Sequence, residues 1–152
     1  MADPSAVLFR RAVLALSGGE TDKMIVTLAC QLGRPVKAEL VGVHVVEIDW
    51  THPLDADIAG RSEEAQQILD LAEATAETSK YHLEPVLLQA RDVGAALVDE
   101  ASERAADVLI CGLPYRRKFG GDFAVGRTIP YVLKNAPCAV WVVRAPMPEE
   151  LS

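Results

Sequence analysis

The sequence predicts an α/β fold, with an open parallel sheet that carries helices on both faces. Three observations predict it. Short apolar runs alternate with segments of helical periodicity along most of the chain. The apolar runs are nearly continuous, as in strands that are buried on both faces of a parallel sheet. Half of the 152 residues are hydrophobic, and a chain of this length can bury a core of its own.

The N-terminal third predicts two strands around one helix. The apolar run at 12–16 predicts the first strand, because it is short and ends in turn-forming glycines. Apolar residues recur at helical spacing over 22–32, and Gly33 stops that helix. A β-branched run over 38–46 predicts the second strand. The aspartate-containing segment 47–60 predicts a long loop.

The middle of the chain predicts two helices around one strand. Residues 62–81 are rich in Ala, Glu, Gln and Leu and carry an apolar stripe, which is typical of an amphipathic helix. The apolar run at 84–89 predicts the third strand. Asp92 is expected to cap a helix over 92–104. The inward-facing residues of that helix are Val93, Ala96, Leu97 and Ala101.

The C-terminal third predicts two strands that are joined by a loop and a short helix. Apolar runs at 107–112 and 138–143 predict the fourth and fifth strands. Residues 113–125 form a basic loop that contains glycine. The helix is expected over 127–135, with Pro130 in its first turn, where a missing N–H does no harm.

Composition excludes several classes of protein. The net charge of −7 and pI of about 4.9 argue against a broad nucleic-acid surface, which needs clustered Lys and Arg. No apolar run approaches the ~20 residues of a membrane span, and the N-terminus lacks the pattern of a signal peptide, so we expect a cytoplasmic protein. The cysteines are odd in number and widely spaced, which predicts buried free thiols rather than disulfides or a structural metal. They are Cys30, Cys111 and Cys138.

Ligands in open sheets of this Rossmann-like kind bind at the carboxyl ends of the strands. Two segments there suit a ligand, residues 17–20 and residues 112–128, because glycines admit a close backbone approach and helix N-termini attract anions. The second segment gathers cations in an otherwise acidic protein. These cations are Arg116, Arg117, Lys118 and Arg127. We predict an anion site there; a solvated turn with ordinary surface cations is the alternative.

This pattern resembles the universal stress protein family over about residues 11–144, most closely at 107–112, 125–128 and 135–143. The resemblance implies a five-stranded parallel sheet of order 3-2-1-4-5. It implies dimerisation through the last strand, and binding of ATP or AMP, with Mg²⁺ as the accompanying ion. Residues 1–152 are then one domain of this family.

The nucleotide motif of the family is altered in this chain. The motif is Gly, two residues, Gly, nine residues, Gly, then Ser or Thr. Gly112 matches the first glycine, Tyr115 stands at the second, and ten residues then precede Gly126. Arg127 takes the Ser/Thr position, with Thr128 after it, and its guanidinium can pair with a phosphate more strongly than a hydroxyl does.

The resemblance also places residues on the adenine side of the site. Ser17 stands where the family has an Asp that contacts the nucleotide, and Val45 and Val46 follow the second strand on the adenine side. A remodelled site and a lost site both stay open. The predicted ligand-binding residues are Ala15, Leu16, Ser17, Val45, Val46, Cys111, Gly112, Tyr115, Arg116, Gly126, Arg127 and Thr128.

These features predict a regulatory, nucleotide-binding module of the stress response that signals through a homodimer. Segment 112–122 also resembles stress-protein domains that are appended to membrane transporters, which implies a transporter partner. No nucleophile with a positioned base is indicated, so we expect at most slow ATP hydrolysis. No metal or catalytic role is predicted for the histidines, His44, His52 and His82.

Two other functions stay open. Residues 16–22 resemble the phosphate loop of ATP pyrophosphatases, which are adenylating enzymes, although Thr21 stands where that loop has Asp. The alternative for this loop, which we favour, is a capping box in which Ser17 and Glu20 begin the helix. The other function is a dimeric interaction domain without a nucleotide, which pairs through the edge strand at 139–143.

Overall fold

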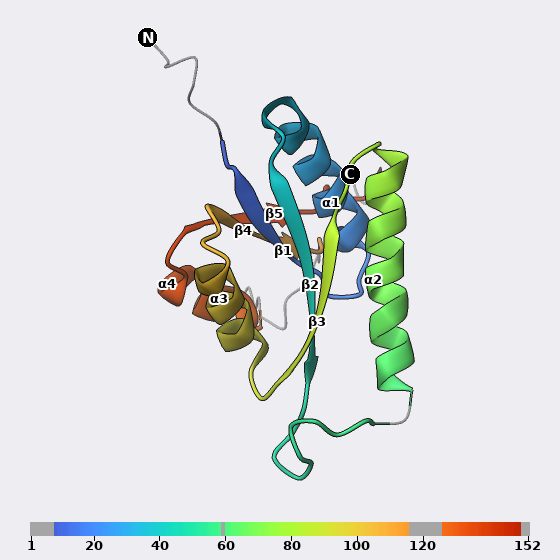
Figure 1. Ribbon diagram of the computed structural model, residues 1–152, viewed down its shortest axis with the longest axis vertical. Coiled ribbons are helices and arrows are strands. Elements are labelled where there is room, and N and C mark those ends of the chain that lie inside the picture. The colour runs from blue at the N-terminus through green and yellow to red at the C-terminus, as the bar shows by residue number, and fades with distance from the viewer. Residues whose placement is uncertain (1–7, 59, 116–125, 150–152) are drawn as a thin grey trace.

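A computed structural model describes residues 8–58, 60–115 and 126–149. Within these ranges the strands are β1 (Arg11–Ala15), β2 (Glu39–Glu47), β3 (Glu84–Ala90), β4 (Val108–Leu113) and β5 (Ala139–Arg144). The helices are α1 (Thr21–Gly33), α2 (Arg61–Thr78), α3 (Val93–Glu103), α4 (Thr128–Asn135) and a short 3-10 helix at Arg34–Val36. The strands form one parallel sheet of order β3-β2-β1-β4-β5 (Figure 1), which confirms the predicted fold and strand order.

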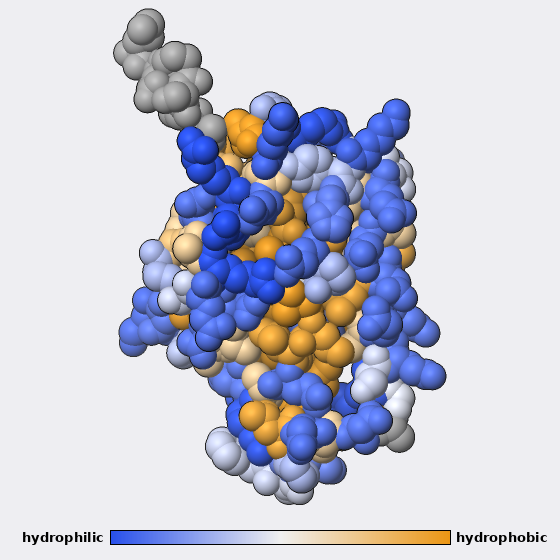
Figure 2. Space-filling model, in the orientation of Figure 1, coloured by the Kyte–Doolittle hydropathy of each residue, from blue (hydrophilic) through white to orange (hydrophobic). Residues whose placement is uncertain are grey.

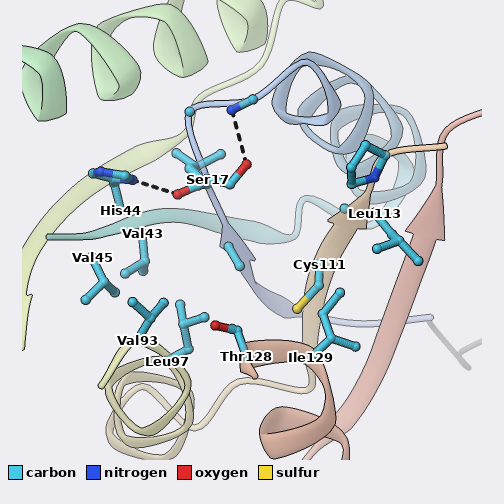
Figure 3. Close-up of a pocket in the computed structure, with 16 residues that line it drawn as sticks. Ser17, Val43, His44, Val45, Val93, Leu97, Cys111, Leu113, Thr128 and Ile129 are labelled. Carbon is cyan, nitrogen blue, oxygen red and sulfur yellow. Dashed lines mark hydrogen bonds between the residues drawn. The ribbon is translucent and has the colours of Figure 1, made fainter. Parts of the chain in front are cut away.

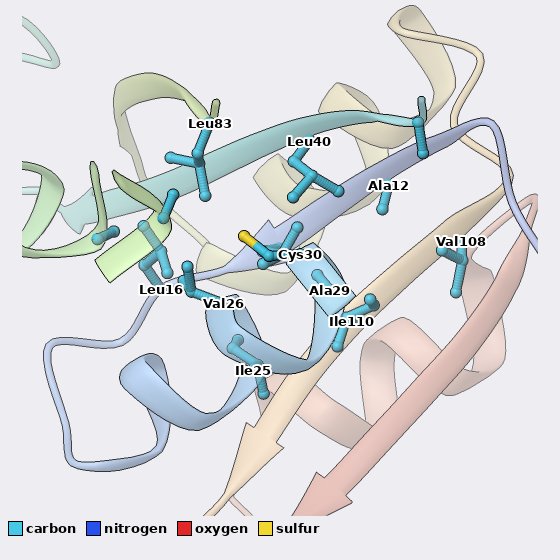
Figure 4. Close-up of a cluster of buried hydrophobic side chains, with 14 of the residues drawn as sticks. Ala12, Leu16, Ile25, Val26, Ala29, Cys30, Leu40, Leu83, Val108 and Ile110 are labelled. Atoms are coloured by element: carbon cyan, nitrogen blue, oxygen red, sulfur yellow. The ribbon is translucent and has the colours of Figure 1, made fainter. Parts of the chain in front are cut away.

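Alternation along the strands divides the core between the two faces of the sheet. Ala12 and Leu14 of β1 pack with α1 and α2, in the cluster that Figure 4 shows. Val13 points the other way and packs with residues of α3 and α4, among them Leu97 and Val132. This is the two-residue period of a strand, and it explains why the strands read as nearly continuous apolar runs.

The predicted elements are present, and most of their ends differ from the prediction by one or two residues. Asp92 caps α3 as predicted, because its carboxylate accepts a hydrogen bond of 2.9 Å from the N–H of Ala95. The helix predicted over 62–81 ends earlier, at Thr78. Lys80 adopts a left-handed φ of 56°, and the chain then turns so that Tyr81 joins the core.

The sheet presents a partly apolar edge on the side of β3. Figure 2 shows hydrophobic residues in the middle of the visible surface, where β2 and β3 run between α2 and α3 in Figure 1. Leu87 of β3 is 40% exposed. Pro85 lies in the same strand and lacks an N–H, which limits the pairing of another strand with this edge.

The thiols differ in burial. Cys30 and Cys111 are buried as predicted, whereas Cys138 is half-buried because it directly precedes the edge strand β5. Burial raises the pKa of all three, and that of Cys111 to about 11.

None of the helices described has the length and apolarity that a bilayer crossing requires.

Candidate functional site

A cavity of about 610 Å³ lies at the carboxyl edge of the sheet. It falls between the ends of β1, β2 and β4 on one side and helices α3 and α4 on the other (Figure 3). This is the point where the strand order reverses, with β2 on one side of β1 and β4 on the other. The volume suits a small-molecule ligand, for which sites of roughly 300–1,000 Å³ are usual.

The structure brings seven of the twelve predicted ligand residues together around this cavity. They are Ala15, Leu16, Ser17, Val45, Cys111, Gly112 and Thr128. Gly18, Gly19, Leu113 and Pro114 also line it and fall within the two segments predicted to suit a ligand. The lining residues that the prediction missed are Val43, His44, Val93, Leu97 and Ile129. Several of these lie beside predicted residues in sequence, but those of α3 are contributed by the tertiary fold.

Four other predicted residues lie outside the lining of the cavity. Val46 packs with Ile48, because neighbouring residues of a strand face opposite sides of the sheet. The ring of Tyr115 lies 5.1 Å from the guanidinium of Arg144 and does not line the cavity. Gly126 and Arg127 lie just before α4, outside the lining. Arg116 falls outside the described residues.

One wall of the cavity is apolar. Val43 and Val45 of β2 lie close to Val93 and Leu97 of α3 on this wall (Figure 3). Leu97 is almost fully buried, and both valines of β2 belong to the core on this face of the sheet. The four side chains form an apolar wall that suits one face of a flat, weakly polar ring.

The loop between β1 and α1 is closed on itself. The two oxygens of the Asp22 carboxylate accept hydrogen bonds from the N–H groups of Ser17, at 2.9 Å, and Gly18, at 2.8 Å. The N–H of Gly19 donates to the hydroxyl of Ser17 at 3.1 Å. The predicted capping box is therefore wrong: α1 begins only at Thr21, and Glu20 makes no capping hydrogen bond with its side chain.

His44 fixes the start of this loop. Its Nδ1 lies 2.7 Å from the carbonyl oxygen of Leu16, so Nδ1 carries the proton that this bond needs (Figure 3). The imidazole is half-buried and lines the cavity. Sequence reasoning gave His44 no role, because its position in a strand does not say which loop the ring reaches.

The start of α4 lies beside α3 on the helix side of the cavity (Figure 3). Thr128 and Ile129 line it there, and the N-terminus of a helix carries a partial positive charge. The guanidinium of Arg127 is bonded to the carboxylate of Glu47, with 2.8 Å between Nη2 and Oε1. This exposed ion pair joins the end of β2 to the start of α4 beside the cavity.

Two positions of the altered motif favour glycine, each for a different structural reason. A Cβ on Gly112 would lie 2.5 Å from Oγ1 and 2.7 Å from Cβ of Thr21, so glycine lets α1 pack closely on β4. Gly126 has a φ of +74°, a left-handed conformation that favours glycine.

Among the described residues no group of three or more His, Cys, Asp or Glu is arranged to hold a metal ion.

A sequence model of the universal stress protein family matches residues 8–144 of the chain. None of the curated proteins compared with the chain matches it. Among solved structures, a universal stress protein from Archaeoglobus fulgidus has a TM-score of 0.74 at 18% identity, covering 90% of this chain and 99% of that one. A dAMP complex of the A. fulgidus protein scores 0.67 at 16% identity, covering 91% and 99%. A universal stress protein in complex with cAMP scores 0.68 at 18% identity, covering 91% and 98%.

Proposed function

The chain belongs to the universal stress protein family, and on that premise we propose that it is a regulatory domain that binds an adenine nucleotide in the cavity. One observation carries the proposal: the cavity combines an apolar wall with the N-terminus of a helix beside it. An adenine nucleotide has the matching parts, a flat base and an anionic phosphate. Proteins of the same fold are solved with dAMP and cAMP, which supports this ligand class.

In the proposed complex the base lies against the apolar wall at Val45 and Val93, close to Ser17. The phosphate lies at the start of α4, where the hydroxyl of Thr128 and the helix N-terminus favour an anion. Arg127 exchanges Glu47 for the phosphate, because both partners are exposed and their ion pair is weak. The ligand is AMP or ATP, with Mg²⁺ held by the phosphates of ATP rather than by a site of the protein.

The geometry supports binding rather than turnover. The hydroxyl of Ser17 accepts a hydrogen bond from Gly19, and the imidazole of His44 is bonded to the carbonyl of Leu16. These two side chains are therefore tied to the loop rather than to each other. Any ATP hydrolysis at this site is expected to be slow.

The ATP pyrophosphatase alternative has less support. A phosphate loop of that kind holds phosphate with its backbone N–H groups. Here the N–H groups of Ser17 and Gly18 are bonded to Asp22. The loop therefore resembles such enzymes in its sequence but lacks free donors at these two positions.

We further propose that a cytoplasmic homodimer forms through β5 and transmits the bound state. β5 is an edge strand, paired with β4 in the described sheet. Val142 of this strand is 37% exposed, and Leu133 and Met147 nearby in sequence are exposed apolar residues. A Val142→Lys variant should sediment as a monomer in analytical ultracentrifugation; an unchanged dimer would place the contact elsewhere. The transporter partner rests on the resemblance of 112–122 alone.

The experiment that tests the proposed ligand fills the space beside the apolar wall. Isothermal titration calorimetry with AMP and with ATP, each with and without Mg²⁺, should show binding to the unaltered protein. Val93→Trp should weaken binding about tenfold or more, because the larger ring occupies the space of the base. Leu71→Trp is the matched control, since Leu71 is exposed on α2, away from the cavity.

Two results would contradict the proposal. Absence of heat and of any rise in melting temperature with AMP or ATP would reject adenine nucleotides, since a ligand of the folded state raises its stability. Equal affinities of the Val93→Trp variant and the unaltered protein would place the ligand outside this cavity.

A further inference from the structure

The β1–α1 loop has the geometry of an anion site, and the chain fills that site itself. Successive N–H groups, of Ser17 and Gly18, point at the two oxygens of one carboxylate at 2.9 and 2.8 Å. Gly18 adopts a φ of +88°, and a left-handed residue is what turns neighbouring N–H groups toward a common anion. The carboxylate belongs to Asp22, in the first turn of α1, where the helix dipole also favours a negative charge.

We propose that Asp22 is a built-in anion that excludes phosphate from the β1–α1 end of the cavity and so determines the orientation of the ligand. Residues 17–19 line the cavity, yet their N–H groups are bonded to Asp22 or to the Ser17 hydroxyl. A phosphate at this wall could accept no hydrogen bond from the N–H groups of these three residues, and the charge of the Asp22 carboxylate would repel it.

The orientation follows from the contrast between the two ends of the cavity. At the β1–α1 end the anion is supplied by the protein and held by two hydrogen bonds. At the α4 end the guanidinium of Arg127 is bonded only to the exposed Glu47 among the partners described. An incoming phosphate therefore binds at the α4 end, and the uncharged part of the ligand lies against the loop. The statement about the nucleotide rests on the proposed function; the statement about the loop does not.

The test is a titration followed by ¹⁵N–¹H NMR, with inorganic pyrophosphate as the probe. In the unaltered protein, pyrophosphate should leave the amide signals of Ser17 and Gly18 unshifted. In Asp22→Ala the two N–H groups are released, and the same signals should shift, with about tenfold tighter pyrophosphate binding at this loop. Asp70→Ala is the matched control, because it removes one acidic charge on α2 without releasing these N–H groups.

Asp22→Asn serves as a second variant, since it keeps the shape of the side chain and removes its charge. A shift of Ser17 and Gly18 in the unaltered protein would overturn the proposal, and that measurement decides the matter even if both variants fail to fold. A gain in Asp22→Ala or Asp22→Asn no larger than that in Asp70→Ala would also overturn it.

A parallel titration separates the failure of this inference from the failure of the proposed function. AMP, compared with adenosine, should add shifts at Thr128 and Ile129 in the unaltered protein. Absence of any AMP or adenosine shift would reject the nucleotide ligand, while the pyrophosphate result would still report on Asp22. A phosphate-specific shift that appears at Gly18 instead would overturn the orientation and keep the nucleotide.

Discussion

The close approach of α1 to β4 predicts a specific cost for Gly112→Ala. The new Cβ would lie 2.7 Å from the Cβ of Thr21, whereas ordinary contacts begin at 3.4 Å, so the two backbones must separate by about 0.7 Å. Rotation of the Thr21 side chain moves its hydroxyl but not its Cβ. β4 is paired on both sides, with β1 and β5, so α1 has to move.

The expected loss of stability follows from that overlap. Overpacking of this kind costs about 2 kcal/mol, and replacing a glycine within a strand returns about 0.5 kcal/mol. The net loss of about 1.5 kcal/mol should lower the melting temperature by about 3–6 °C in a chain of this size. Urea denaturation and calorimetry measure both quantities.

A double-mutant cycle isolates the contact. Thr21→Gly removes the opposing Cβ, so the double variant should be more stable than the sum of the two single changes by about 1 kcal/mol. A Gly112→Ala protein with the stability of the unaltered chain, or strictly additive effects, would refute the packing explanation of this glycine. The presence of glycine at position 112 would then need another explanation.

Three further predictions concern charged and titrating groups. Arg127→Ala should weaken AMP binding about tenfold. Glu47→Gln should strengthen AMP binding about threefold, but only while Arg127 is present, because Glu47 competes with the phosphate for the guanidinium. Unchanged affinities in calorimetry would show that Arg127 does not contact the ligand. The pKa of Asp49 should be about 2 in the folded protein, since hydrogen bonds from Thr51 and then from His52 lower it from 3.8. The stabilisation is present above pH 3.8 and is lost as the pH falls through about 2. A carboxyl ¹³C titration with a midpoint near 3.8 would contradict this prediction. Burial raises the pKa of Cys111 to about 11, so iodoacetamide at pH 8 should alkylate Cys111 far more slowly than Cys138. Peptide mass spectrometry measures both rates. Equal rates would mean that the cavity exposes the thiol of Cys111.

Most of the fold was predictable because it follows from local patterns. The apolar runs at 84–89 and 107–112 lie within a residue or two of β3 and β4. The cap of α3 was predictable from Asp92 alone, since the bond runs to a residue three positions along the same chain. The strand order came from the family resemblance, because periodicity does not determine which strands are neighbours.

The loop after β1 shows where local reasoning failed. Ser17 and Glu20 have the spacing of a capping box, but the helix starts only at Thr21 and the acid that closes the loop is Asp22. A capping box and a loop closed by a carboxylate use the same residue types one or two positions apart. The spacing alone does not choose between them, and the folded loop shows that Asp22 makes the bonds.

The alternation of apolar runs and amphipathic helices determined the fold class, the approximate ends of the elements and the edge of the sheet at which the cavity lies. These properties depend on residues that are near one another in the chain. The tertiary structure decided which side chains surround the cavity: it placed Val93 on the same wall as Val45, bonded Arg127 to Glu47, and turned Val46 away. Those pairings join residues that are tens of positions apart, and only the packing of the helices on the sheet brings them together.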